Sequence, residues 1–172
     1  MKTVFEKEIL VTEQQEKTNI AVPFSLPTAA KQVVVHFSYA PKKLEGEAAE
    51  QKAEACLARD VPQEERGNYP DASTYTPLLN LITVSVDDPE GYRGCAHRQN
   101  PQQTHILSES QSSPGFLSRK CPAGKWRVML HVHALVTGSC TCKLAVDYDC
   151  LLFPSYPSHD TPVLDLVAHP TP

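Results

Sequence analysis

The sequence KWRVMLHVHALV, Lys125–Val136, is the strongest indicator of the fold class, because its apolar residues recur at every second position. Alternate side chains of a β-strand share one face of the sheet, so this spacing is typical of a strand that is buried on one side. The apolar face consists of Val128, Leu130, Val132, Ala134 and Val136. The opposite face carries Met129, the two histidines and Leu135. The stretch therefore predicts one long strand with a single buried face.

The same alternation occurs on both sides of this stretch and predicts six further strands. They are Thr3–Val11, Thr18–Leu26, Lys31–Tyr39, Asn80–Asp87, Thr104–Glu109 and Thr141–Asp149. Thr137-Gly-Ser139 separates the long strand from the last one, and we expect these two to be antiparallel neighbours. Pro23 predicts an edge strand or a bulge, because proline cannot donate a ladder hydrogen bond. Short strands separated by turn sequences, with 15 prolines among 172 residues, predict an all-β antiparallel sandwich and not a helix bundle.

One segment breaks the alternation. Glu47–Arg59, EAAEQKAEACLAR, is rich in helix formers and has no β-branched residue. We predict one α-helix inserted into the sandwich at about residues 46–60, followed by a surface loop at 61–77. The sandwich domain then spans residues 1–150. The proline-rich sequence of residues 151–172 predicts an extended C-terminal segment, through which a homo-oligomer could form.

Charge and hydropathy exclude several partners. The net charge is −4 with no basic stripe, so we expect no nucleic-acid partner. No apolar run approaches 18 residues, so no membrane-spanning helix is expected. The N-terminus lacks the apolar core of a signal peptide, which predicts a cytoplasmic protein with reduced thiols. We interpret the cysteines as buried structural residues, with a zinc site or redox chemistry as alternatives: Cys56, Cys95, Cys121, Cys140, Cys142 and Cys150.

Two groups of residues are candidate metal ligands. His131-Val-His133 would direct two imidazoles to one face of a strand, which is a common arrangement of metal-binding histidines. Asp87 and Asp88, with Glu90, place carboxylates at a turn, and hard oxygen ligands of this kind bind calcium. In both groups the alternative is a set of solvated side chains without a metal, and we expect no cofactor.

Exposed aromatic residues are the candidate ligand-binding residues. Tyr69, Tyr75, Tyr92 and Trp126 are the aromatic side chains that a sugar could stack on. A core position is the alternative for Trp126. Arg93 and His97, close to Tyr92 in the sequence, complete the candidate set. The sequence contains no G-x-S-x-G elbow, P-loop or G-x-G-x-x-G, so it predicts no catalytic residue and no nucleotide site.

Three strings occur together that resemble a known family. They are NLITVSVDDPEGYRGCAHR (Asn80–Arg98), ILSESQSSPGF (Ile106–Phe116) and CPAGKWRVMLHVHALVTGSCTCKLAV (Cys121–Val146). With Thr18–Lys43, they resemble the N-terminal β-sandwich of CehA/McbA-type metallohydrolases of the PHP superfamily over about residues 5–150. In such proteins a catalytic domain with the metal ligands follows the sandwich, and no residue here matches its metal motifs. The resemblance therefore implies a jelly-roll-like accessory module without catalytic activity.

We accordingly expect a non-catalytic binding or interaction module whose partner is a glycan or a separate PHP-type hydrolase. Two alternatives stay open. One is the remnant of a metal-dependent hydrolase that uses His97, His105, His131 and His133. The other is a purely structural or oligomerisation domain.

Overall fold

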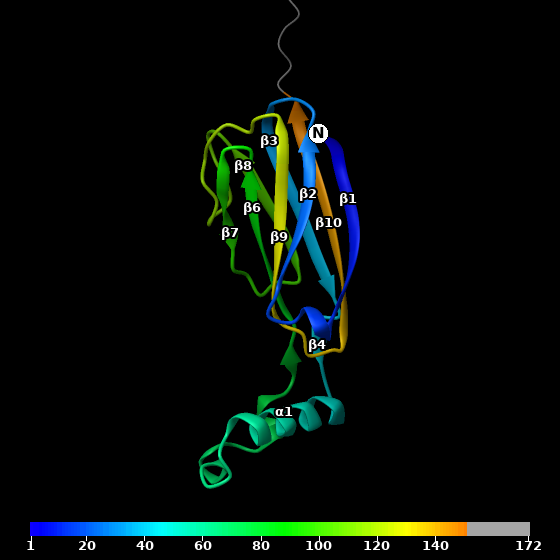
Figure 1. The fold of residues 1–172 in the computed structure, drawn as a ribbon, viewed down its shortest axis with the longest axis vertical. Coiled ribbons are helices and arrows are strands. Elements are labelled where there is room, and N and C mark those ends of the chain that lie inside the picture. The colour runs from blue at the N-terminus through cyan, green and yellow to red at the C-terminus, as the bar shows by residue number, and fades with distance from the viewer. Residues whose placement is uncertain (151–172) are drawn as a thin grey trace, which may run out of the picture.

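Two four-stranded antiparallel sheets pack face to face in the computed structural model, which describes residues 1–150 (Figure 1). Sheet A contains, in spatial order, β1 (Lys2–Thr12), β10 (Ser139–Cys150), β3 (Ala30–Ala40) and β8 (Gln102–Ser108). Sheet B contains β2 (Asn19–Leu26), β9 (Gly124–Ala134), β6 (Leu81–Asp88) and β7 (Gly91–Ala96). The predicted all-β sandwich with one helix is confirmed. Pro23 lies on the edge strand β2, as predicted.

The chain crosses from one sheet to the other at every connection between the sandwich strands except the β6–β7 hairpin. This order of crossings is that of an eight-stranded jelly roll. The expectation that β9 and β10 are antiparallel neighbours is wrong. Residues 135–138 lead from sheet B to sheet A, where β10 lies between β1 and β3, while β9 lies between β2 and β6. The turn sequence is compatible with a hairpin within one sheet and with a crossing between the sheets. Only the crossing lets the apolar face of β9 and that of β10 oppose each other.

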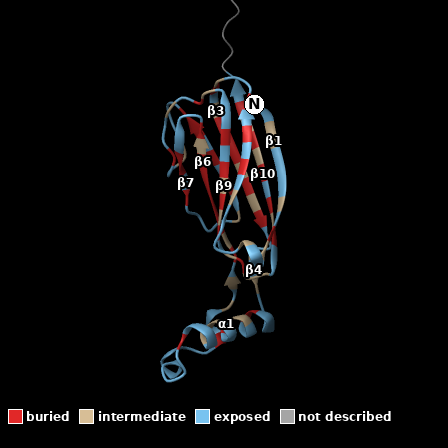
Figure 2. Cartoon of the chain, viewed as in Figure 1, coloured by how far each residue is buried: buried red, intermediate tan, exposed pale blue. Residues whose placement is uncertain are grey.

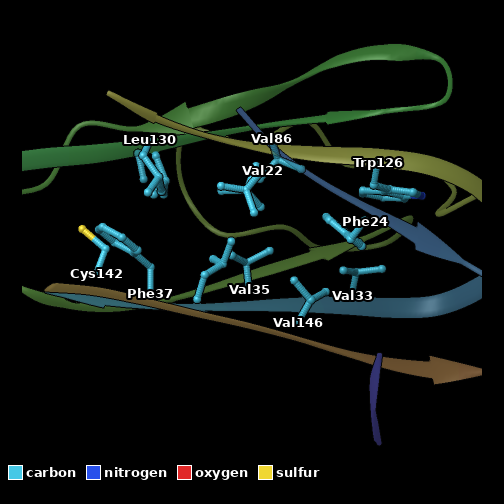
Figure 3. Close-up of a cluster of buried hydrophobic side chains, with 14 of the residues drawn as sticks. Val22, Phe24, Val33, Val35, Phe37, Val86, Trp126, Leu130, Cys142 and Val146 are labelled. Atoms are coloured by element: carbon cyan, nitrogen blue, oxygen red, sulfur yellow. The ribbon is translucent and has the colours of Figure 1, made fainter. Parts of the chain in front are cut away.

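The core lies between the sheets and consists of the alternate residues that the sequence predicted. Valines 33, 35, 128 and 132 are at most 1% exposed, and Phe37 and Leu130 lie among them. Figure 3 shows side chains of the two sheets facing each other across the core, and Phe24 and Trp126 lie next to each other on adjacent strands of sheet B. The buried colour in Figure 2 is accordingly concentrated on the strands of the sandwich. Burial of these apolar side chains is the main stabilising contribution to the fold.

The apolar alternation of the long strand ends earlier than predicted. β9 stops at Ala134, and a bulge in its pairing with β6 places Ala134 opposite Leu81 and Val132 opposite Ile82. Beyond the bulge the buried residue is Leu135, at 1% exposed, whereas Ala134 and Val136 are only half-buried. The sequence also gave no indication of strand β7, because two glycines interrupt its alternation.

The predicted helix forms an arm beyond one end of the sandwich (Figures 1 and 2). Helix α1 (Glu47–Asp60) is connected to the sheets through a two-stranded ribbon of β4 (Lys43–Leu44) and β5 (Leu78–Leu79). The predicted loop contains the short 3₁₀ helices η2 (Arg66–Asn68) and η3 (Ala72–Tyr75), and another, η1 (Glu13–Gln15), follows β1. Ala49 and Ala53 of α1 are buried against this loop rather than against a sheet. The arm therefore has a small apolar cluster of its own.

A buried asparagine connects the arm to the sandwich. Asn80 is 0% exposed, and its Nδ2 donates to Pro41 O at 2.9 Å and to Thr137 Oγ1 at 2.7 Å. Its Oδ1 accepts a hydrogen bond from Val136 N at 2.6 Å. The two chain segments that lead into the arm and the crossing between the sheets are thus held by one side chain. Sequence reasoning missed this residue, because a single asparagine next to a strand is typical of an exposed turn.

The remaining expectations have mixed outcomes. Cys121, Cys140 and Cys142 are buried, but Cys56 is half-buried and Cys95 and Cys150 are exposed, so the buried interpretation holds for three of the six. No helix within residues 1–150 is long and apolar enough to cross a membrane. The predicted C-terminal segment, residues 151–172, lies outside the described residues.

Candidate functional site

The candidate residues of the sequence divide between the two faces of sheet B. Five point to its outer face: Asp87, Tyr92, His97, His131 and His133. The other three are buried: Asp88, Arg93 and Trp126. Neighbouring positions of a strand face opposite ways, so pairs that are adjacent in sequence, such as Asp87 and Asp88, are separated by the sheet.

Trp126 belongs to the core, as the alternative interpretation predicted. Its side chain is 2% exposed, and its Nε1 donates a hydrogen bond to Pro122 O at 3.0 Å. Its ring therefore offers no open face for a sugar. The exposed aromatic residues are dispersed, with Tyr69 and Tyr75 on the arm and Tyr92 on sheet B. The predicted aromatic platform is not assembled.

Arg93 and Asp88 form a buried ion pair rather than a ligand site. Both side chains are 0% exposed, and Arg93 Nη1 lies 2.9 Å from Asp88 Oδ2. Arg93 also donates to the backbone carbonyl oxygens of Ser108, Arg119 and Lys120. Arg119 donates to Asp88 from the loop at 2.7 Å. The carboxylate of Asp88 is thus fully occupied.

The two carboxylates of the candidate calcium site point in opposite directions. Asp87 lies on the outer face of sheet B and pairs with Arg127, whereas Asp88 points inward to Arg93. A calcium ion needs six to eight oxygen ligands that converge on one point. Among residues 1–150, no group of three or more His, Cys, Asp or Glu side chains is placed to hold a metal ion.

Two histidines of β9 lie over small hydroxyl residues of β6. His131 Nε2 lies 2.8 Å from Ser85 Oγ, and its Nδ1 lies 2.8 Å from Asn19 Oδ1. His133 Nε2 lies 2.8 Å from Thr83 Oγ1. Burial, followed by a neighbouring histidine, lowers the pKa of both His131 and His133 below the ordinary value of 6.5. Both shifts favour the neutral form of the ring.

The four histidines of the hydrolase alternative do not converge. His97, His131 and His133 lie on the outer face of sheet B, but His105 is on β8 of sheet A. The His105 ring is 1% exposed and packs against Phe116, with Nε2 at 3.0 Å from Gln103 Oε1. His105 thus belongs to the interior between the sheets.

Acid should destabilise the protein through His105. Burial, followed by the charge of Arg98, lowers the pKa of His105 from 6.5 to about 4 in the folded protein. The unfolded chain binds the proton near pH 6.5, so stability present above this pH is lost as the pH falls toward 4. We expect this residue to account for about 2 kcal/mol of destabilisation between pH 7 and pH 4.5. Urea unfolding at the two pH values measures it, and His105→Leu should lack this component. Equal losses in both proteins would exclude His105 as the acid-sensitive group.

An open groove crosses the outer face of sheet A, where the sequence predicted no site. It encloses about 830 Å³. Two rows of outward-facing side chains cross the four strands, in the order β1, β10, β3 and β8. They are Glu6, Ala145, His36 and Thr104, and Glu8, Lys143, Ser38 and Gln102. The small residues Ala145 and Ser38 occupy the central strands, while glutamates line one edge and Thr104 and Gln102 the other.

Two polar pairs lie in and beside the groove. Lys143 Nζ lies 3.4 Å from Glu8 Oε2, and both side chains are exposed. His36 Nε2 lies 3.2 Å from Asp147 Oδ2, next to the groove. The alternation in the sequence identifies these residues as an outer face. It does not reveal the groove, because a flat solvent-exposed face has the same alternation.

The fold and the groove define a class of molecule, a jelly-roll sandwich with an open polar groove on one sheet. Searches of the sequence against models of known protein families and against curated proteins find no match.

Proposed function

We propose that the protein is a non-catalytic binding module that holds a short neutral glycan in the groove of sheet A. The observation that carries this proposal is the groove itself, about 830 Å³ in volume with small residues on the central strands. Ligand sites of proteins are typically concave and enclose about 300–1,000 Å³. The groove would provide such a site on four hydrogen-bonded strands, of which the two central ones are paired on both sides.

The chemistry of the groove favours a polyhydroxyl ligand. Lys143 donates hydrogen bonds, the glutamates accept them, and Ser38, Thr104 and Gln102 do both. A neutral sugar also donates and accepts at each hydroxyl group, so it can match this mixture. An anionic ligand such as nucleic acid would face Glu6 and Glu8 at one edge. No Phe, Tyr or Trp ring points outward into the groove, so hydrogen bonds would determine the specificity.

The resemblance to CehA/McbA-type proteins supports an accessory role, in which the bound glycan or the module itself is presented to a separate PHP-type hydrolase. We place the protein in the cytoplasm, which agrees with its buried thiols at Cys121, Cys140 and Cys142. A structural or oligomerisation domain is the remaining alternative, and the experiment below distinguishes it.

A substitution that fills the groove should abolish glycan binding. Ser38→Tyr places a large ring on the central strand β3, where the ligand would lie. Full-length protein is applied to a printed array of neutral oligosaccharides, and each bound sugar is then titrated by calorimetry. We expect a sugar that binds with a Kd in about the micromolar to millimolar range. Its affinity should fall at least about tenfold in Ser38→Tyr, which corresponds to about 1.4 kcal/mol of binding free energy.

Ser25→Tyr is the matched control, because Ser25 is an exposed serine on β2 of the other sheet. It should leave the affinity unchanged. Equal losses in Ser38→Tyr and Ser25→Tyr, or no loss in either, would place the ligand elsewhere. An array without any bound sugar would argue against glycan binding and favour a structural role.

A further inference from the structure

We propose that His97 and His133 form a binding site for a divalent transition metal, of the zinc class, on the outer face of sheet B. Both side chains are exposed, one directly after β7 and the other on β9. Strand β6 lies between these strands. The two rings meet in an edge-to-face arrangement, with 5.1 Å between their centroids and 74° between their planes.

The separation of the rings fits a tetrahedral metal. Zinc–imidazole bonds are about 2.0–2.1 Å long, so two rings on one tetrahedral ion have centroids about 5 Å apart. The centroids of His97 and His133 match this distance, and one of the two exposed rings must turn about its side-chain bonds to direct a nitrogen lone pair at the ion. His131 and His133, the pair that the sequence singled out, are 6.3 Å apart between centroids, which would require a nearly linear arrangement about the ion.

The existing hydrogen bonds determine which histidines have a ring nitrogen available for a metal ion. Both ring nitrogens of His131 already have partners, Ser85 and Asn19, so this residue has no lone pair to offer without breaking a bond. His133 uses only Nε2, which lies 2.8 Å from the buried Thr83 hydroxyl. A metal on His133 Nδ1 requires Nε2 to carry the proton, and the Nε2–H group can donate a hydrogen bond to Thr83 Oγ1. Metal-bound histidines are commonly oriented in this way through their second nitrogen.

The site has two protein ligands. No third side chain among residues 1–150 is placed to complete it. Water, or a donor from a bound molecule, would occupy the other positions, which makes this an open and exchangeable site. The site lies on sheet B, whereas the glycan groove lies on sheet A, so the two proposals are independent.

Titration of the full-length protein with Zn²⁺ alone tests the site. Calorimetry measures the affinity, and histidine side-chain NMR signals identify the ligands. We expect one zinc ion per chain, with His97→Gln and His133→Gln each weakening binding by at least about tenfold. Thr83→Val should weaken it by about tenfold through loss of the second-nitrogen partner, and Thr83→Ser, which keeps the hydroxyl, should retain it.

Two further variants are negative controls that should keep zinc binding. His131→Gln should leave the affinity within about twofold, as should Cys95→Ser, which removes an exposed thiol on the same face. Loss of binding in either of these variants, with His97→Gln unaffected, would overturn the proposal, as would the absence of binding at millimolar zinc. Circular dichroism confirms that each variant is folded before it is titrated.

Discussion

Replacing Asp88 by asparagine should destabilise the protein by about 3–5 kcal/mol. The substitution removes the only carboxylate that contacts the fully buried guanidinium of Arg93 within residues 1–150. An unpaired buried charge is costly, because it has lost its water and gained no countercharge. Arg119 would lose its buried partner at the same time. Urea unfolding at pH 7 measures the change in the free energy of unfolding.

Asp87→Asn is the matched control, since it makes the same chemical change at the adjacent residue. Asp87 pairs with Arg127 on the outer face, and the Arg127 side chain is 50% exposed. Exposed ion pairs contribute at most about 1 kcal/mol, so this variant should remain close to the original stability. Similar losses in both variants would mean that burial of the Arg93–Asp88 pair is not what makes it important.

The Asp88 network explains why the D-P-x-G-Y-R string occurs in the sequence. Asp88 Oδ1 accepts a hydrogen bond from Glu90 N at 2.8 Å, which fixes the turn between β6 and β7. Arg93 then binds carbonyl oxygens of the chain on both sides of the loop between β8 and β9. The string therefore builds one corner of the sandwich. Asp88 and Arg93 in this string are explained by the fold, without a ligand.

The sequence predicted the faces of the strands better than their neighbours. Burial of one face imposes a two-residue repeat, so the inward positions of β3, β9 and β10 could be read directly. The repeat says nothing about which strand lies alongside, and the pairing of β9 with β10 was wrong for this reason. Strand β7 was missed because Gly91 and Gly94 interrupt its alternation.

The candidate site residues were chosen by chemical type, and type does not determine direction. Tyr92 and Arg93 are adjacent on β7, so one is exposed and the other buried. Alternation alone would have separated these two residues, and also Asp87 from Asp88. The groove of sheet A could not have been found in this way, because it depends on which strands, distant in sequence, lie side by side in the sheet. The pairing of His97 with His133 likewise depends on the order of strands in sheet B.

Gly94→Ala should be comparably damaging, at about 3–5 kcal/mol, because two backbones meet at this glycine. Gly94 has a φ of +131°, which disfavours a side chain. A Cβ there would collide with Gly115 O and lie 2.7 Å from Phe116 Cα. Cys95 N donates to Gly115 O at 3.0 Å, so the contact also carries a hydrogen bond. The R-G and S-P-G-F sequences, far apart in the chain, are therefore the two sides of a single close contact.

Gly138→Ala separates the collision from the backbone strain. Gly138 has a φ of +75°, and a Cβ at this position meets nothing within 4 Å. It should cost only the left-handed conformation, about 1–2 kcal/mol. Gly115→Ala should resemble Gly94→Ala, since its Cβ would collide with Cys95 O. The double variant Gly94→Ala/Gly115→Ala should lose less stability than the sum of the two single losses, because both substitutions open the same contact. Thermal and urea unfolding of the four variants would contradict this account if Gly94→Ala and Gly138→Ala cost the same.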